Sequence, residues 1–215
     1  MILAIDTATS TVTVALASSD GALIAGGCGT TPRSHAEELG PLLAEVFAVP
    51  GQVSQVVGGV GPGSFAGLRV GLAAAASIGW ALGIPATGLC TLDVLALQAA
   101  TEFSGYVVAD ARRGELFYGD YREGVRVDAL GVLDRRVLAR VVAGSPVTGD
   151  DHLLQDFDKR AKGSVLLTPT ALGQAAAKAV AAGSRQSLRP MYLRAPDIAG
   201  KPGKTLPTSG SVADA

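Results

Sequence analysis

The segment Gly59-Val60-Gly61-Pro62-Gly63-Ser64-Phe65-Ala66-Gly67-Leu68-Arg69-Val70-Gly71 decides how the first half of this chain folds. The valine-containing run 55–58 before it predicts a strand, and the small-residue run 72–82 after it predicts a helix. A strand that breaks into glycines and continues as a helix resembles a phosphate-cradling loop. The lysine that such a loop normally uses is absent here. Two interpretations therefore stay open: a phosphate site, or the same architecture in another use.

The composition indicates a globular chain with a large core. Of its 215 residues, 48% are hydrophobic and 17% are charged, and the formal net charge is −1. These values fit one large domain or two small lobes, and they argue against disorder and against autonomous nucleic-acid binding. Cys28 and Cys90 are expected to be buried free thiols, which fits a reducing cytoplasm. No basic region precedes an apolar stretch at the N-terminus, so we expect no signal peptide.

The uncharged stretch 70–92 is long enough to span a bilayer. Gly79, Gly83 and Pro85 interrupt it, and a Gly-Ile-Pro sequence is typical of a helix end followed by a new strand. A buried helix followed by a buried strand is therefore favoured, and we expect no membrane contact.

The order of elements predicts two lobes and a tail. Residues 1–102 predict a first lobe with the order β-β-β-α-β-α-β-α, and residues 103–194 predict a smaller second lobe that again begins with a strand meander. Residues 195–215 are rich in Gly, Pro, Ser and Thr and are expected to form a flexible tail. Ser34-His35-Ala36-Glu37 predicts a capping box, and Thr168-Pro169 predicts the start of the last helix. Expected strands are 2–7, 11–18, 23–29, 55–60, 86–90, 106–110, 115–121, 125–133 and 165–167, and expected helices lie near 34–47, 72–82, 92–100, 134–141, 151–157 and 170–182.

Five segments, in this order and spacing, resemble the TsaB (YeaZ) family of bacterial tRNA threonylcarbamoyladenosine biosynthesis proteins. The resemblance covers residues 1–194, and the glycine loop and the Asp-Ala-Arg-Arg-Gly-Glu segment are its most specific parts. The segments are Met1-Ile2-Leu3-Ala4-Ile5-Asp6-Thr7, Ser34-His35-Ala36-Glu37, Gly61-Pro62-Gly63-Ser64-Phe65-Ala66-Gly67-Leu68-Arg69, Asp110-Ala111-Arg112-Arg113-Gly114-Glu115 and Pro190-Met191-Tyr192-Leu193-Arg194.

The resemblance implies a two-lobed α/β fold of the actin/Hsp70/sugar-kinase type, with ribonuclease H-like lobes and a reduced second lobe. It implies a non-catalytic role beside TsaD, which transfers threonylcarbamoyl to adenosine in ANN-decoding tRNAs, with TsaC making the activated intermediate and TsaE supplying an ATPase. ATP and Mg²⁺ then belong to partner subunits, and tRNA is met only through the complex. Family members pair through first-lobe helices, with TsaD or with a second copy of themselves.

Two turns are candidates for contact with an anion or nucleotide. In kinases of this fold the first hairpin turn approaches the phosphates, and here Ala8 stands where a glycine is wanted. In the second lobe, two arginines occupy the place where backbone should approach a phosphate, so an external anion is the alternative. Each turn could equally be an ordinary surface turn. The candidate contacts are Asp6, Thr7, Ser10, Arg112 and Arg113, and the structural loop comprises Gly61, Pro62, Gly63, Ser64 and Gly67.

Metal and hydrolase chemistry find no support in the sequence. His35 and His152 are the only histidines, and they are too far apart for a His-x-x-x-His zinc pair. Ser64 lacks the spacing of a nucleophile elbow. We therefore expect no metal ligands and no catalytic residues.

Small residues recur every four positions from Gly67 to Gly83 and form one strip along the predicted helix. Glycine in a helix costs about 1 kcal/mol relative to alanine, so close packing must offset it. The strip could pack on the lobe's own sheet or on a partner, and the first helix could extend the same surface. The expected partner surface comprises Leu39, Leu42, Leu43, Val46, Leu72, Ala75, Ala76, Gly79 and Trp80.

The sequence leaves two functions open. The first is a non-enzymatic scaffold that docks on TsaD, and the second is an active ATPase or phosphotransferase of the same fold. A metalloprotease is a distant third.

Overall fold

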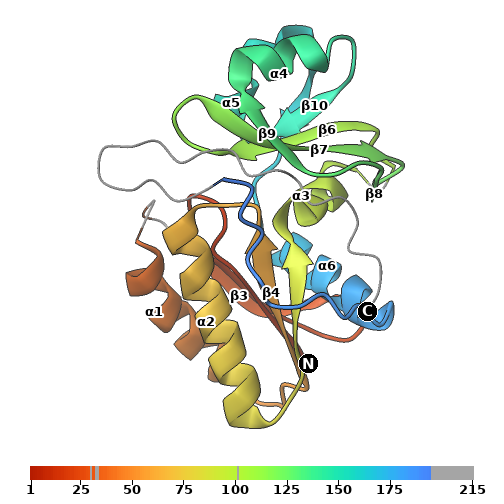
Figure 1. Ribbon diagram of the computed structural model, residues 1–215. Helices are drawn as coiled ribbons and strands as arrows, with labels where there is room; N and C mark the ends of the chain where they lie inside the picture. The colour runs from red at the N-terminus through yellow and green to blue at the C-terminus, as the bar shows by residue number, and fades with distance from the viewer. Residues whose placement is uncertain (30, 32–33, 101, 195–215) are drawn as a thin grey trace.

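The computed structural model describes residues 1–29, 31, 34–100 and 102–194, and these form two lobes that are each built on one mixed sheet (Figure 1). The expected tail, residues 195–215, lies outside the described residues.

The first lobe contains a sheet of five strands in the order β3-β2-β1-β4-β5. β1 runs antiparallel to β2 and parallel to β4. Both β1 and β2 are buried along their whole length, as expected for apolar strands covered on both faces. The strands are β1 (Ile2–Asp6), β2 (Thr13–Ala17), β3 (Leu23–Cys28), β4 (Gln55–Gly61) and β5 (Ala86–Cys90).

Helices cover both faces of this sheet. Leu3, Ile5 and the other inward residues of one face pack under α1 (His35–Phe47) and α2 (Phe65–Leu82). Ile2 and Ala4, which alternate with them, pack with α3 (Thr91–Ala99) and α6 (Pro169–Ala181) on the other face. The period-two alternation of β1 therefore supplies two separate cores.

The second lobe repeats the strand topology of the first. Its sheet has the order β11-β10-β6-β7-β8, and β9 also pairs with β7. β6 runs antiparallel to β7 and parallel to β10, as β1 does to β2 and β4. The elements are β6 (Gly105–Asp110), β7 (Glu115–Arg122), β8 (Val125–Arg126), β9 (Gly131–Asp134), α4 (Arg135–Val141), β10 (Val147–Gly149), α5 (Asp151–Leu154), the 3-10 helix η1 (Gln155–Arg160) and β11 (Ala161–Ser164).

Helix α3 joins the lobes, because it contacts β4 and β5 of the first sheet and β6 and β7 of the second. Asp93 of α3 accepts a hydrogen bond of 2.7 Å from the hydroxyl of Tyr121 and forms an ion pair of 3.3 Å with Arg126. The junction therefore has a polar clamp beside its apolar core.

The expected lobe 103–194 needs one correction. Helix α6 packs on β1, β2 and β3, so residues that follow the second lobe in sequence complete the first. Its face of Ala171, Leu172 and Ala175 is buried against the first sheet, which would otherwise expose that face to water.

The element boundaries differ most in the second half. The expected strand 125–133 is two short strands, β8 and β9, and residues 165–167 form no strand. Neither β10 nor β11 was expected, and both are too short to show an alternating pattern. The expected helix 151–157 divides into α5 and η1.

Helix α2 begins at Phe65, seven residues before the expected start at Leu72. Ser64 caps it by accepting a hydrogen bond of 3.1 Å from the amide of Gly67. Gly67 therefore lies in the helix and not in the loop. Thr168 caps α6 as expected, but Ser34 makes no capping hydrogen bond, so the capping box at α1 was wrong.

By length and composition alone, α2 could also cross a membrane. In the fold its small-residue strip lies on the lobe's own sheet: Gly71 packs on Thr7 at the end of β1, and Gly79 packs on Ala86 of β5. Of the two environments proposed for the strip, the lobe's own sheet is the one observed.

Candidate functional site

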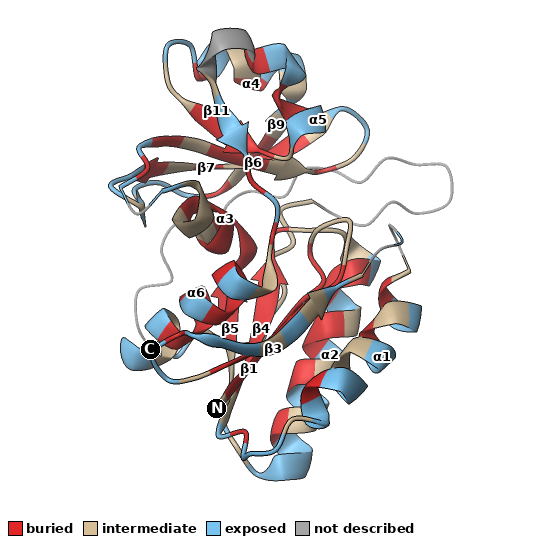
Figure 2. Ribbon diagram, turned by 180° about the vertical axis from the view of Figure 1, so that it is seen from behind, coloured by how far each residue is buried: buried red, intermediate tan, exposed pale blue. Residues whose placement is uncertain are grey.

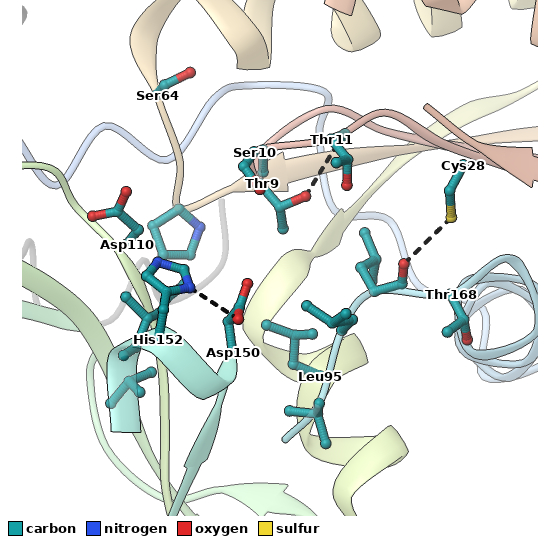
Figure 3. Close-up of a pocket in the computed structure, with 18 of the residues that line it drawn as sticks. Thr9, Ser10, Thr11, Cys28, Ser64, Leu95, Asp110, Asp150, His152 and Thr168 are labelled. Carbon is teal, nitrogen blue, oxygen red and sulfur yellow. Dashed lines mark hydrogen bonds and ion pairs between the residues drawn. The ribbon is translucent and has the colours of Figure 1, made fainter. Parts of the chain in front are cut away.

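A cleft of about 470 Å³ lies between the two lobes (Figure 3). The first lobe contributes the β1–β2 turn, the end of β3 and the loop before α2. The second lobe contributes the end of β6, the start of α5 and the segment before α6. The lining residues are Ala8, Thr9, Ser10, Thr11, Cys28, Gly29, Pro62, Ser64, Leu95, Val108, Ala109, Asp110, Arg112, Asp150, His152, Leu153, Val165, Leu166, Leu167 and Thr168.

Asp6 and Thr7 do not line this cleft, although the sequence suggested them as anion contacts. Both are fully buried. The Thr7 hydroxyl donates to the Gly67 carbonyl at 2.7 Å and accepts from the Gly71 amide at 3.0 Å. Thr7 therefore anchors α2 to the end of β1. Of the three candidate contacts in this turn, Ser10 is the one that lines the cleft.

The Asp6 carboxylate is enclosed by protein. It accepts hydrogen bonds from the Ala8 amide at 2.8 Å and from the Thr91 hydroxyl at 2.7 Å. Burial raises its pKa from 3.8 to about 6, although these hydrogen bonds and nearby His35 act in the opposite direction. Asp6 thus organises the first turn from beneath.

The second-lobe turn is held by its own aspartate. Asp110 accepts a hydrogen bond from the Arg112 amide at 2.8 Å and forms an ion pair of 3.4 Å with the Arg112 guanidinium. Arg112 and Arg113 have φ values of 67° and 56°, a conformation that favours glycine. Arg112 lines the cleft, whereas Arg113 is exposed beside it.

Asp150 and His152 form a pair that was not predicted from the sequence. The Nδ1 atom of His152 lies 2.9 Å from a carboxylate oxygen of Asp150, and both residues line the second-lobe wall of the cleft. Polar residues at the carboxyl end of a parallel strand are the signal for such a site. This pattern could not be used here, because the three-residue strand β10, which ends directly before Asp150, was not predicted from the sequence.

The two cysteines differ in their surroundings. Burial raises the pKa of the Cys90 thiol to about 12, so it stays protonated. Cys28, expected to be buried, is exposed at the end of the edge strand β3 and lines the cleft. An edge strand is covered less completely than a central one, which explains the error.

His35 is buried at the start of α1, and its Nε2 atom lies 3.0 Å from the Thr9 carbonyl oxygen. It therefore supports the first-lobe turn. Within residues 1–29, 31, 34–100 and 102–194, no three His, Cys, Asp or Glu side chains gather as metal ligands.

Helix α2 carries exposed residues along its length (Figure 2), and two of them have large apolar side chains. Trp80 is 87% exposed, and Leu82 at the end of the helix is 49% exposed. Ala73 and Ala76 continue the exposed line toward the N-terminus of the helix. Ala73, Ala76 and Trp80 share one side of the helix, whereas Leu82 lies about 200° away around the helix axis. We call Ala73, Ala76 and Trp80 the α2 face.

The expected partner surface is only partly at the surface. Ala76 and Trp80 are exposed, and Leu42 and Leu43 are half-buried. The apolar sides of both helices turn toward the sheet, so the other five residues of the expected surface are buried within the lobe. They cannot contact a partner while the lobe is folded. These buried residues are Leu39, Val46, Leu72, Ala75 and Gly79.

A C-terminal strap, residues 184–194, runs from α6 along the first lobe to the second (dark blue in Figure 1). The Met191 amide donates to the Val60 carbonyl at 2.8 Å. The Tyr192 ring lies 5.0 Å from the ring of Phe65, the first residue of α2. Arg194 then donates to the Ala111 carbonyl at 2.9 Å and pairs with Glu115 at 3.1 Å. The strap therefore joins α2 to the arginine turn at the cleft.

Replacing Arg194 should loosen this connection. Its side chain is 10% exposed, so Arg194→Ala removes a largely buried charged hydrogen bond, and we expect a loss of about 2 kcal/mol in the free energy of unfolding. Amide hydrogen exchange should also become faster in residues 111–115 than elsewhere in the lobe. Arg189→Ala, at an exposed arginine of the same strap, should stay within about 0.5 kcal/mol. Equal effects of the two variants would contradict the role of Arg194.

Two lobes of repeated topology with a cleft between them define an α/β protein of the actin-like class. The structure matches YeaZ from Pseudomonas aeruginosa with a TM-score of 0.70 and 25% identity, over 89% of this chain and 99% of that one.

A family model described as tRNA N6-adenosine threonylcarbamoyltransferase (TsaD) matches residues 23–138, just over half of the chain. The chain belongs to this family and, within it, to the TsaB (YeaZ) branch. The tRNA threonylcarbamoyladenosine biosynthesis protein TsaB of Bacillus subtilis is 34% identical over 56% of this chain and 55% of its own length. An uncharacterised protein of Mycobacterium leprae is 40% identical over 68% of this chain and 43% of its own length. The chain thus spans about half the length of these curated relatives.

Proposed function

We propose that this chain is a non-catalytic subunit of a tRNA threonylcarbamoyladenosine-forming complex, in which it docks on and activates TsaD. The observation that carries the proposal is the α2 face, where an 87% exposed tryptophan stands on a helix that is otherwise fixed to its own sheet. ATP and Mg²⁺ belong to partner subunits such as TsaE, and tRNA is met through the assembled complex in the cytoplasm.

The α2 face has the properties of an interface centre. Exposed tryptophans are enriched among residues that dominate binding energy. The alanines beside Trp80 leave room for close approach of a partner helix, as small residues do where helices pack tightly. Phe47 at the end of α1 is 46% exposed, and α1 contacts α2, so a partner could cover both helix ends. A second copy of the chain would use the same face when TsaD is absent.

Independent phosphotransfer is less well supported. The Ala8 amide, which a phosphate would need in the first turn, donates to Asp6. The Thr7 hydroxyl is occupied by Gly67 and Gly71, and Arg112 is paired with Asp110. The Ala8 amide, the Thr7 hydroxyl and the Arg112 guanidinium therefore already have partners within the chain.

The test is copurification and reconstitution with TsaD from the same organism. Ala76→Glu should weaken docking by at least about 100-fold, because it buries an unpaired carboxylate in the interface. Trp80→Ala should weaken docking by about 30-fold or more. Transfer of threonylcarbamoyl to tRNA should fall in parallel, and a large excess of the Trp80→Ala variant should restore the rate.

Ala143→Glu provides the matched control, since Ala143 is an exposed alanine of the second lobe. It should bind TsaD as the unaltered chain does. Full docking by Ala76→Glu, or full transfer activity of TsaD without this chain, would refute the proposal.

A further inference from the structure

We propose that the cleft between the lobes binds a neutral, hydroxyl-bearing small molecule of nucleoside size and excludes its phosphorylated form. The cleft volume of about 470 Å³ lies within the range of small-molecule sites, roughly 300–1,000 Å³. The inference does not depend on the proposed docking, because the cleft residues do not belong to the α2 face.

The charges of the lining oppose a phosphate. Asp110 and Asp150 both face the cleft, and Arg112 is the only lysine or arginine among the described lining residues. Its guanidinium already pairs with Asp110 at 3.4 Å. A phosphate placed between two carboxylates is repelled by both, and a low-dielectric cleft strengthens that repulsion.

The backbone opposes a phosphate as well. Cradles for phosphate use several free amides in glycine-rich turns. In the first-lobe turn the Ala8 amide points inward to Asp6, and in the second-lobe turn the Arg112 amide donates to Asp110. In each turn, one amide that could approach a phosphate is therefore given to the turn's own aspartate.

The other polar groups of the cleft lining are mainly hydrogen-bond acceptors, so they favour a ligand with several hydrogen-bond donors. Carboxylate oxygens accept several hydrogen bonds each, and those of Asp110 and Asp150 use only part of this capacity in the contacts described above. The Nε2 atom of a neutral His152 is a further acceptor, because Nδ1 faces Asp150. Figure 3 shows these side chains on one side of the cleft and Thr9 and Ser10 on the other. Ligand hydroxyls placed between the two sides would find partners on both.

The other part of the lining is apolar. Val108 of β6, Leu153 of α5 and the segment residues Val165 and Leu167 are all buried. Leu95 of α3 is a further buried apolar residue of the lining. Such a wall suits the face of a flat ring. A flat ring joined to a hydroxyl-bearing group, without a charge, is the shape of a nucleoside.

Calorimetric titration with adenosine and with AMP, used as probes at pH 8, tests the proposal. We expect adenosine to bind with a Kd on the order of 10⁻⁴ M, and AMP to bind at least about tenfold more weakly. Ser10→Leu removes a facing hydroxyl and fills space in the cleft, so it should abolish adenosine binding. Ser19→Leu, on the exposed β2–β3 turn away from the cleft, should leave binding unchanged.

Leu166→Trp provides a second block, because Leu166 lines the cleft and is 56% exposed, so a larger side chain there should not disturb the core. The proposal is overturned if adenosine does not bind at millimolar concentration, if AMP binds as tightly as adenosine, or if both blocking variants still bind. Ala76→Glu should bind adenosine normally, so failure of the docking proposal and failure of this one can be told apart.

Discussion

Gly71→Ala should destabilise this protein by about 3 kcal/mol, although alanine is the better helix former. A Cβ atom at position 71 would lie 2.4 Å from the Thr7 hydroxyl oxygen, inside the core. That hydroxyl bridges the Gly67 carbonyl and the Gly71 amide, the pair that a regular helix bonds directly. Alanine would therefore break two buried hydrogen bonds or push α2 away from β1. Urea unfolding of the variant measures the loss.

A double-mutant cycle sharpens this prediction. Thr7→Ala removes the atoms that collide with the new methyl group, so Gly71→Ala should cost at least about 1.5 kcal/mol less in that background. Ser77→Ala, at an exposed position of the same helix, should change stability by no more than about 0.5 kcal/mol. Equal costs of Gly71→Ala with and without Thr7 would show that the bridge does not set the position of α2.

Asp6→Asn should stabilise the protein at pH 7 by about 3 kcal/mol. Burial raises the pKa of Asp6 from 3.8 to about 6, so between about pH 4 and 6 the folded state holds a proton that the unfolded state has released, and at pH 7 the folded state must bury the ionised carboxylate. The contribution of Asp6 to stability is therefore full below about pH 4 and is lost as the pH rises through about 6; a shift of about two units corresponds to about 3 kcal/mol. An asparagine can still accept from Ala8 and can donate to the Thr91 hydroxyl.

Unfolding by urea at a series of pH values between 4 and 7 provides the measurement. The difference between Asp6→Asn and the unaltered chain should grow with pH and become constant above about 7. Asp20 provides a control in which the change in stability has the opposite sign, because its hydrogen bond from Ser18 lowers its pKa. Asp20→Asn should therefore be less stable than the unaltered chain at neutral pH and equally stable in acid. A difference that does not vary with pH for Asp6→Asn would mean that Asp6 is ionised as readily in the folded as in the unfolded chain.

The first lobe could be predicted from sequence because its strands are long apolar runs with clear ends. β5 begins and ends at the expected residues, and Ser64 and Thr168 cap helices as their residue types suggest. The strands of the second lobe are harder to predict from the sequence. β10 and β11 are set by pairing with neighbouring strands. β10 is Val147-Thr148-Gly149, too short for its valine and threonine to predict a strand, and β11 consists of Ala, Lys, Gly and Ser, which have low β propensity.

The site was predicted only in part for the same reason. Because β10 was not recognised, Asp150 and His152 could not be placed at the end of a strand in the cleft wall. The expected partner surface also placed Leu72 and Trp80 on one face of α2. Eight residues turn a helix by about 80° beyond two full turns, so the two side chains point to different sides. One is buried in the core and the other is almost fully exposed.

The return of α6 and the strap to the first lobe has a consequence for synthesis on the ribosome. Strands β1 to β5 of the first lobe precede the second lobe in the chain, yet the part of one sheet face that α6 covers stays open until residues 169–194 have emerged. The nascent chain must therefore carry an uncovered apolar sheet while the whole second lobe is translated, a period in which such surfaces invite aggregation or chaperones. Completion of the first lobe therefore depends on contacts between α6 and β1, which are far apart in the sequence and slow to form.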